Sequence, residues 1–234
     1  MEICLLYSIS VVIPTLNEAA YLPFTLERLS QRQFLEIIVA DGGSSDETRE
    51  IALSFSVKML DCPRGRSRQM NEAARVATGD ILLFLHADTL LPKKWEDAIR
   101  AALANDYVCG GAFSLRIQGN LLGLRLVEAL ANFRSRIFIM PYGDQAIFVR
   151  TATFWEMGGF PDLPIMEDFE FMRRLRTRGG LCILPERVIT SGRRWKKLGI
   201  IRTTAINQAI IAGYYAGISP DKLAGFYRKG PHSD

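Results

Sequence analysis

Short runs of β-branched and other apolar residues alternate with segments of helical periodicity through the first half of the chain. The apolar runs predict strands at residues 9–14, 36–40, 57–60 and 81–85. The intervening segments predict helices at residues 18–30, 66–77 and 93–104. A further helix is expected to begin at Ser44, because Glu47 has the spacing of a capping box. This βαβα order predicts an α/β domain with a mostly parallel sheet and helices on both faces.

The second half is less regular and ends in a helical tail. Strands are expected at residues 112–117, 145–150 and 181–185, and helices at 121–134 and 166–178. From Leu198 a helical pattern follows, with a break near Gly217 and Pro220. The apolar residues of this tail cover more than one helical face, so we expect it to pack on the rest of the chain or on a second copy. The chain is therefore divided into one domain over residues 1–197 and a tail over 198–234.

Composition and charge narrow the class of protein. The 234 residues are 48% hydrophobic and 23% charged, as in an ordinary globular protein. A formal net charge of +4 suits an anionic ligand and is far from the signature of a nucleic-acid-binding protein. The cysteines form no CxxC pair, which argues against structural zinc and favours buried thiols in a reducing compartment; they are Cys4, Cys62, Cys109 and Cys182.

No segment resembles a signal peptide or a membrane-spanning helix. The N-terminus lacks a basic start and a cleavage site, and the apolar stretch 198–218 is interrupted by Arg202, Asn207 and Gln208. We expect a cytoplasmic enzyme, with peripheral contact to the inner face of the membrane as the alternative.

Acidic and polar residues follow three of the predicted strands. The first strand is followed by Pro14-Thr-Leu-Asn-Glu18, the second by Asp41-Gly-Gly-Ser-Ser-Asp46, and the fourth by His86-Ala-Asp88. Each cluster alone is typical of turns and helix caps. Because the carboxyl ends of parallel strands meet at one edge of a sheet, the three clusters together predict a binding site.

These motifs resemble the nucleotide-binding half of family 2 glycosyltransferases, which have the glycosyltransferase-A fold. The resemblance rests first on Ile13 to Ala19, Ala40 to Thr48 and Gly79 to Thr89. It continues in the second half with Gly143-Asp-Gln-Ala-Ile-Phe-Val149, Met166-Glu-Asp-Phe-Glu170 and Ser191-Gly-Arg-Arg-Trp195, which look like the acceptor and leaving-group motifs. The resemblance implies a nucleotide-binding half at residues 8–92 and an acceptor half at 110–197. Phe84 to Thr89 with Gly143 to Gln145 is also similar to a small subgroup found beside radical-enzyme pathways, including one proposed for arsenosugar synthesis.

The resemblance implies inverting transfer of a sugar from a nucleotide diphosphate donor, with Mn²⁺ or Mg²⁺ as the cofactor. Asp88 would be the metal ligand, and the metal would neutralise the charge that develops on the departing diphosphate. The implied catalytic base is Asp168, with Glu167 as the second candidate. The implied donor-binding residues are Pro14, Thr15, Asn17, Glu18, Asp41, Arg66, His86, Ala87, Asp88, Asp144, Arg193, Arg194 and Trp195.

The chain departs from the family's Asp-x-Asp metal motif, because His86 stands where the first carboxylate is usual. Imidazole is a poor ligand for Mg²⁺ and an acceptable one for Mn²⁺. His86 can instead donate a hydrogen bond to ribose, or it can be a structural histidine. We favour the hydrogen-bonding role over direct ligation.

Other functions fit the sequence less well. A triad hydrolase would need a Gly-x-Ser-x-Gly elbow, and a dinucleotide-dependent oxidoreductase would need Gly-x-Gly-x-x-Gly after the first strand; both motifs are absent. A sugar nucleotidyltransferase and a non-catalytic nucleotide-sugar-binding protein remain the alternatives. The expected partners are a UDP-sugar donor, with GDP as the alternative, and a small-molecule or lipid-linked acceptor. A homodimer stays open, and no nucleic acid is expected.

Overall fold

The computed structural model describes residues 7–30, 35–121 and 123–229. Its first half contains β1 (Ile9–Thr15), α1 (Leu22–Ser30), β2 (Glu36–Asp41), α2 (Thr48–Leu53), β3 (Lys58–Asp61), α3 (Arg66–Val76) and β4 (Ile81–Phe84). Strand β1 is central here, because it pairs in parallel with β2 on one side and with β4 on the other. The carboxyl ends of these strands therefore lie along one edge of the sheet.

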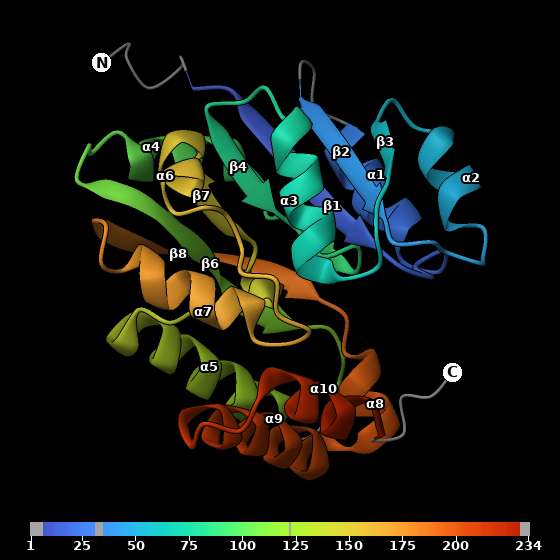
Figure 1. Cartoon of the computed structure of the whole chain (residues 1–234), viewed down its shortest axis with the longest axis vertical. Helices are drawn as coiled ribbons and strands as arrows, with labels where there is room; N and C mark the ends of the chain where they lie inside the picture. The colour runs from blue at the N-terminus through green and yellow to red at the C-terminus, as the bar shows by residue number, and fades with distance from the viewer. Residues whose placement is uncertain (1–6, 31–34, 122, 230–234) are drawn as a thin grey trace.

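The second half is built from more varied elements. They are β5 (Thr89–Leu90), α4 (Trp95–Leu103), β6 (Val108–Ile117), α5 (Leu124–Phe138), η2 (Gly143–Gln145), β7 (Ile147–Arg150), α6 (Thr151–Glu156), α7 (Glu167–Leu175), β8 (Gly180–Thr190), α8 (Arg193–Leu198), α9 (Ile200–Tyr215) and α10 (Pro220–Lys229). Figure 1 shows α5, α9 and α10 together at one end of the molecule's long axis.

Over the described residues the strands form an eight-stranded sheet in the order β3-β2-β1-β4-β7-β6-β8-β5. Strand β7 runs antiparallel to both β4 and β6, and β5 runs antiparallel to β8. The remaining pairs are parallel, so the expectation of a mostly parallel sheet is confirmed. Because β7 is reversed, η2, which precedes it, lies beside the carboxyl end of β4, where Phe84 pairs with Ile147.

Helices cover both faces of the sheet because neighbouring residues of each strand point to opposite faces. Val11 packs with Leu22 and Leu26 of α1 in one core cluster. Val12 packs with Met70 and Ala73 of α3 in another. This two-sided burial explains why the strand sequences are continuously apolar instead of alternating.

The tail packs on the rest of the chain, as expected. Ile210 of α9 and Leu223 of α10 form a third cluster with Met140, Met166 and Phe169. No helix among the described residues is long and apolar enough to cross a membrane. Cys62, Cys109 and Cys182 are free thiols, and Cys4 lies outside the described residues.

Two local expectations need correction, and two short helices were missed. The capping box at Ser44 is wrong, because the Ser44 amide and hydroxyl both donate to Asp41, and α2 begins only at Thr48. The first helix begins at Leu22, four residues later than expected. Helices α6 and α8 were not predicted from the sequence; each is only six residues long, too short to show a helical period.

Candidate active site

A cavity of about 540 Å³ opens at the carboxyl end of β4. Strand β4 ends at Phe84, and the chain then turns so that the Thr89 amide donates to the His86 carbonyl at 3.1 Å. This turn directs His86 and Asp88 to the cavity, where η2 and the start of α7 face them. The predicted site residues that line it are Arg66, His86, Asp88, Asp144, Glu167, Asp168, Arg193, Arg194 and Trp195.

Arg193 neutralises two carboxylates at the mouth of this cavity. Its two terminal nitrogens donate to the Glu18 carboxylate at 2.8 and 2.6 Å, and its Nε lies 3.3 Å from Asp88 Oδ2. Burial raises the pKa of Glu18 above its usual range, although Arg193 opposes this effect. Glu18 and Asp88 thus share one cationic partner, Arg193.

Asp168 is held in one orientation by the backbone. Its Oδ2 accepts a hydrogen bond from the Gly143 amide and its Oδ1 accepts one from the Phe169 amide, both at 2.7 Å. Gly143 also approaches His86, since a Cβ built on this glycine would lie 3.0 Å from both Asp168 Oδ2 and His86 Nε2. A side chain at position 143 would therefore disturb both groups.

Glu167 has different contacts from its neighbour Asp168. It is buried and forms an ion pair with the Arg66 Nε. Burial acts to lower the pKa of Arg66, but the Glu167 and Asp168 carboxylates outweigh it and hold this pKa above its ordinary value. Because Glu167 is already paired, Asp168 is the better placed of the two to accept a proton.

Two further groups in the cavity have shifted pKa values. Burial lowers the pKa of His86 to about 4, and the nearby Arg66 acts in the same direction, so the imidazole is neutral at physiological pH. Burial raises the pKa of Asp144 to about 6, against the opposing effect of Arg134. A neutral imidazole can donate or accept a hydrogen bond.

Arg194 brings hydrogen-bond donors that the protein does not use. Its guanidinium donates to the Tyr227 hydroxyl and lies 4.2 Å from the centre of that ring. Its Nε and Nη2 atoms are buried and have no hydrogen-bond partner among the described residues, and the same holds for Trp195 Nε1. Burial lowers the pKa of Arg194. Unmet buried donors are costly, so these atoms indicate a place for an anionic ligand.

A second cavity of about 570 Å³ adjoins the first through Arg66 and Pro164. Among the predicted residues it is lined by Pro14, Thr15, Glu18 and Arg66. Gln69, which the sequence analysis did not single out, lines it as well and donates to the carbonyls of Thr15 and Ala40 at 2.7 and 2.8 Å. Gln69 thereby joins the ends of β1 and β2.

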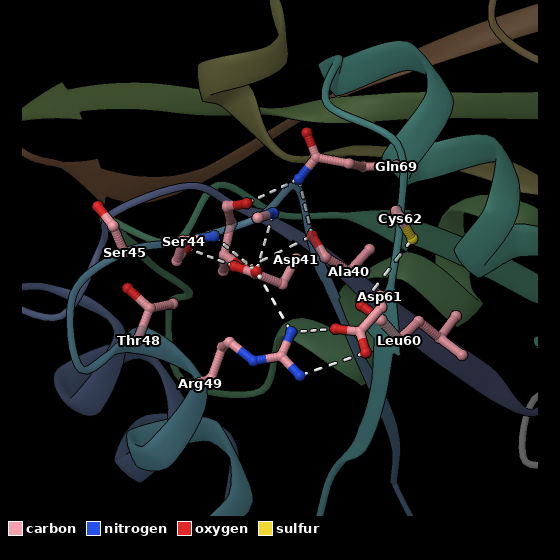
Figure 2. A network of polar contacts seen from close by, with 12 residues as sticks. Ala40, Asp41, Ser44, Ser45, Thr48, Arg49, Leu60, Asp61, Cys62 and Gln69 are labelled. Atoms are coloured by element: carbon pink, nitrogen blue, oxygen red, sulfur yellow. Dashed lines mark hydrogen bonds and ion pairs between the residues drawn. The ribbon is translucent and has the colours of Figure 1, made fainter.

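Asp41, Asn17 and Ala87 line neither of these two cavities. Asp41 is fully buried and accepts hydrogen bonds from Thr15 and Gly43. It also accepts two from Ser44 (Figure 2). Asn17 accepts one from the Ser45 amide at 2.8 Å. The loops after β1 and β2 are therefore tied together by the residues that were expected to touch the nucleoside.

Part of the first cavity's wall comes from the tail. Asn207, Ile210 and Ile211 of α9 and Ala224 and Tyr227 of α10 line it, together with Tyr142 and Phe169. The sequence showed only that the tail is apolar on several faces; no local motif indicates which of its residues meet the cavity.

No group of three or more His, Cys, Asp and Glu side chains that could hold a metal ion is found within residues 7–30, 35–121 and 123–229. A cation at Asp88 would therefore take most of its ligands from a bound diphosphate and from water. Mg²⁺ in particular is commonly held this way, by one or two carboxylates and substrate phosphates.

The order of these motifs on the sheet can be compared with known proteins. Residues 10–155 match the sequence model of glycosyl transferase family 2. The chain belongs to this family. It is 30% identical over 239 aligned residues to a PGL/p-HBAD biosynthesis glycosyltransferase of Mycobacterium bovis, an alignment that covers 81% of this chain and 91% of the relative. A shorter match, to validoxylamine A glucosyltransferase of Streptomyces hygroscopicus, is 32% identical over 107 residues and covers 41% of this chain and 25% of the relative.

Solved structures share the glycosyltransferase-A fold of this family member. TarS of S. aureus in complex with UDP has a TM-score of 0.65 and 19% identity, covering 79% of this chain and 60% of that one. The mannosyltransferase PcManGT of Pyrobaculum calidifontis, in complex with GDP-Man and Mn²⁺, has a TM-score of 0.64 and 21% identity, covering 78% and 56%. The chain thus spans somewhat over half the length of these two structures, and at such identities the likeness concerns the fold alone.

Proposed function

We propose that this glycosyltransferase transfers a sugar with inversion from a nucleotide diphosphate donor to an acceptor hydroxyl. The proposal rests on two side chains that line one cavity. This cavity holds an oriented carboxylate, Asp168, together with an arginine, Arg194, whose buried donors are unmet. The first suits a base and the second suits a diphosphate.

The donor is proposed to span both cavities. Its nucleoside would occupy the second cavity, beside Thr15 and Glu18, and its diphosphate would lie in the first, near Asp88 and Arg194. The shared residue Arg66 would stand where the two meet. UDP is the nucleotide proposed first and GDP second; the solved neighbours were obtained with UDP and with GDP-Man.

A divalent cation, Mn²⁺ or Mg²⁺, is proposed at Asp88, where it would supply positive charge for the departing diphosphate. This proposal is supported by the presence of two carboxylates, Asp88 and Glu18, against one arginine, Arg193. Arg193 would then exchange its carboxylate partners for diphosphate oxygens, which guanidinium groups bind bidentately. His86 is proposed to act as a neutral hydrogen-bonding group beside the donor.

The acceptor is proposed to carry its hydroxyl on an apolar body, as part of a small molecule or a lipid. The cavity wall around Asp168 is formed largely by apolar and aromatic side chains, namely Ile165, Met166, Phe169, Ile210, Ile211 and Ala224. Such a wall favours an apolar ligand and leaves few groups to recognise a second sugar.

Transfer then needs one proton to move. Asp168 accepts the proton of the acceptor hydroxyl as its oxygen forms the new bond to the sugar's anomeric carbon. The bond from that carbon to the diphosphate oxygen breaks on the opposite side, and the negative charge stays with the diphosphate. The two backbone amides that hold Asp168 leave a further lone pair on each oxygen for the incoming proton.

The test separates binding from catalysis. A thermal-shift panel of nucleotide diphosphates and nucleotide sugars, with and without Mn²⁺, identifies the donor; ligand at about 100 times its Kd adds about 2.7 kcal/mol of stability. Donor turnover is then measured in Asp168→Asn, with Asp106→Asn as the control because its side chain is 96% exposed. We expect a loss of about 10²- to 10⁴-fold in turnover with donor binding retained. Unchanged turnover in Asp168→Asn would refute its role as the base.

A further inference from the structure

Helix α5 is apolar on the side that faces away from the protein. Leu126, Leu130, Phe133 and Ile137 are between 58% and 63% exposed. Their spacing of four, three and four residues confines them to an arc of about 60° on the helix surface. The residues that α5 buries, Leu124, Glu128 and Ser135, lie on its opposite side. We call the four exposed side chains the α5 stripe.

The surroundings of the α5 stripe are basic. Helices α5, α8 and α9 contain one acidic residue, Glu128, and six basic residues that do not line the cavity, which are Arg125, Arg134, Arg136, Lys196, Lys197 and Arg202. Glu128 is buried and already accepts hydrogen bonds from Arg125 and from the Ile117 amide. Lys196, Lys197 and Arg202 are exposed, so the charge offered to a partner on this end of the molecule is positive.

The lysines of α8 lie near the N-terminus of α5. A Cβ built on Gly119 would lie 4.0 Å from Lys196 Cε, and one on Gly123 would lie 3.4 Å from Ile200 Cδ1. The N-terminus of α5 therefore lies beside the junction of α8 and α9, at the end of the molecule where Figure 1 shows these helices together. Ile201, in the first turn of α9, is a further apolar side chain at this end of the molecule and is 87% exposed.

We propose that the α5 stripe and its basic surroundings dock this protein on an anionic lipid bilayer. An apolar stripe flanked by arginines and lysines is the pattern of a helix that lies in the membrane interface. The apolar side chains enter the acyl boundary, and the basic side chains meet the anionic headgroups. The docking does not depend on the proposed transfer reaction. Its consequence for that reaction is that α9, which lines the cavity through Ile210, lies at the lipid surface.

A second copy of the chain fits this surface less well. Five exposed side chains of α5, the stripe and Phe138, offer on the order of 500 Å² per copy, below the roughly 800 Å² that a stable interface buries on each partner. Pairing two α5 helices would also bring Arg134 and Arg136 of both copies together with no exposed acidic side chain on α5 to compensate. Like charges across such a helix pair are unfavourable.

The test is flotation of the full chain with vesicles of phosphatidylcholine, alone and with about 30% phosphatidylglycerol. The variant Leu130→Ser/Phe133→Ser is compared with Phe24→Ser/Leu53→Ser, whose exposed apolar residues, 61% and 66% accessible, lie on α1 and α2. A third variant, Lys196→Gln/Lys197→Gln, tests the charge. Circular dichroism checks that each variant is folded.

We expect the wild type to bind only to the anionic vesicles, and we expect salt at about 0.5 M to weaken this binding. Partition should fall at least tenfold in Leu130→Ser/Phe133→Ser, about tenfold or more in Lys196→Gln/Lys197→Gln, and not in the α1–α2 control. Equal loss in that control, or no flotation of the wild type, would overturn the proposal. So would a dimer in light scattering that is lost in Leu130→Ser/Phe133→Ser without any flotation, which would assign the stripe to a second copy.

Discussion

Gly143 offers a small perturbation of the proposed base. Its amide donates to Asp168, and a Cβ at this position would lie 3.0 Å from both Asp168 Oδ2 and His86 Nε2. The glycine has no positive φ, so alanine is free to adopt its backbone conformation. Gly143→Ala therefore acts through the added methyl group alone, and it removes no titratable side chain from the site.

The size of the effect follows from these contacts. Ordinary van der Waals contact begins at 3.4 Å. Asp168 and His86 must therefore each withdraw by about 0.4 Å, close to the tolerance of about 0.5 Å for a catalytic group. Because a misplacement of about 1 Å costs about 10²-fold, turnover should fall about sixfold for one displaced group and up to about fortyfold for two. The added strain should lower the free energy of unfolding by about 1–3 kcal/mol.

The assay is release of nucleoside diphosphate from the donor, with kcat and the donor Kd measured separately. Gly225→Ala is the matched control, because a Cβ on that helical glycine meets no atom within 4 Å. It should leave kcat unchanged and stabilise the protein by up to about 1 kcal/mol. A wild-type kcat in Gly143→Ala, or a loss that lies wholly in donor affinity, would show that the position of Asp168 and His86 does not limit turnover.

Three further results are expected. With Mn²⁺ present, Asp88→Ala should bind nucleotide diphosphate as weakly as the wild type does with chelator. Equal calorimetric affinities for both proteins, with Mn²⁺ and with chelator, would remove the metal from the mechanism. Arg194→Met should weaken nucleotide diphosphate binding by about 10- to 100-fold. The Tm of the ligand-free protein should not fall, because two buried donors of Arg194 are unmet before the ligand arrives; a lower ligand-free Tm would contradict this. Asp144→Asn should raise the free energy of unfolding at neutral pH by about 1–2 kcal/mol. A carboxyl whose pKa is raised to about 6 favours folding only while it is protonated, so this gain should disappear below about pH 4; urea denaturation that shows the same difference at both pH values would argue against it.

The sequence by itself determined the sheet's first four strands and the residues that follow them. Continuous apolar runs such as Val11 to Ile13 indicate strands buried on both faces, and β1, β2, β3 and β4 begin and end within one or two residues of the predicted limits. His86 and Asp88 are two residues apart after β4, so the sequence already predicted that they lie at the same edge of the sheet. Local signals sufficed because each of these features depends on neighbours in sequence.

Only the tertiary structure decided which charged groups face one another. Arg193 meets Glu18 across 175 residues, and Arg66 meets Glu167 across 101. The Arg66 pair distinguishes the surroundings of Glu167 from those of Asp168, which instead accepts hydrogen bonds from the Gly143 and Phe169 amides. The reversed strand β7 brings Gly143 to the end of β4, and no local pattern indicates its direction.

The same holds for α5. Its sequence is apolar on two sides, and the helical period cannot tell which side the core takes. Packing against β6 buries Leu124 and Glu128, and it leaves Leu130 and Phe133 at the surface. Burial is a property of what lies opposite a side chain, and for a helix with two apolar faces that partner is chosen by the rest of the fold.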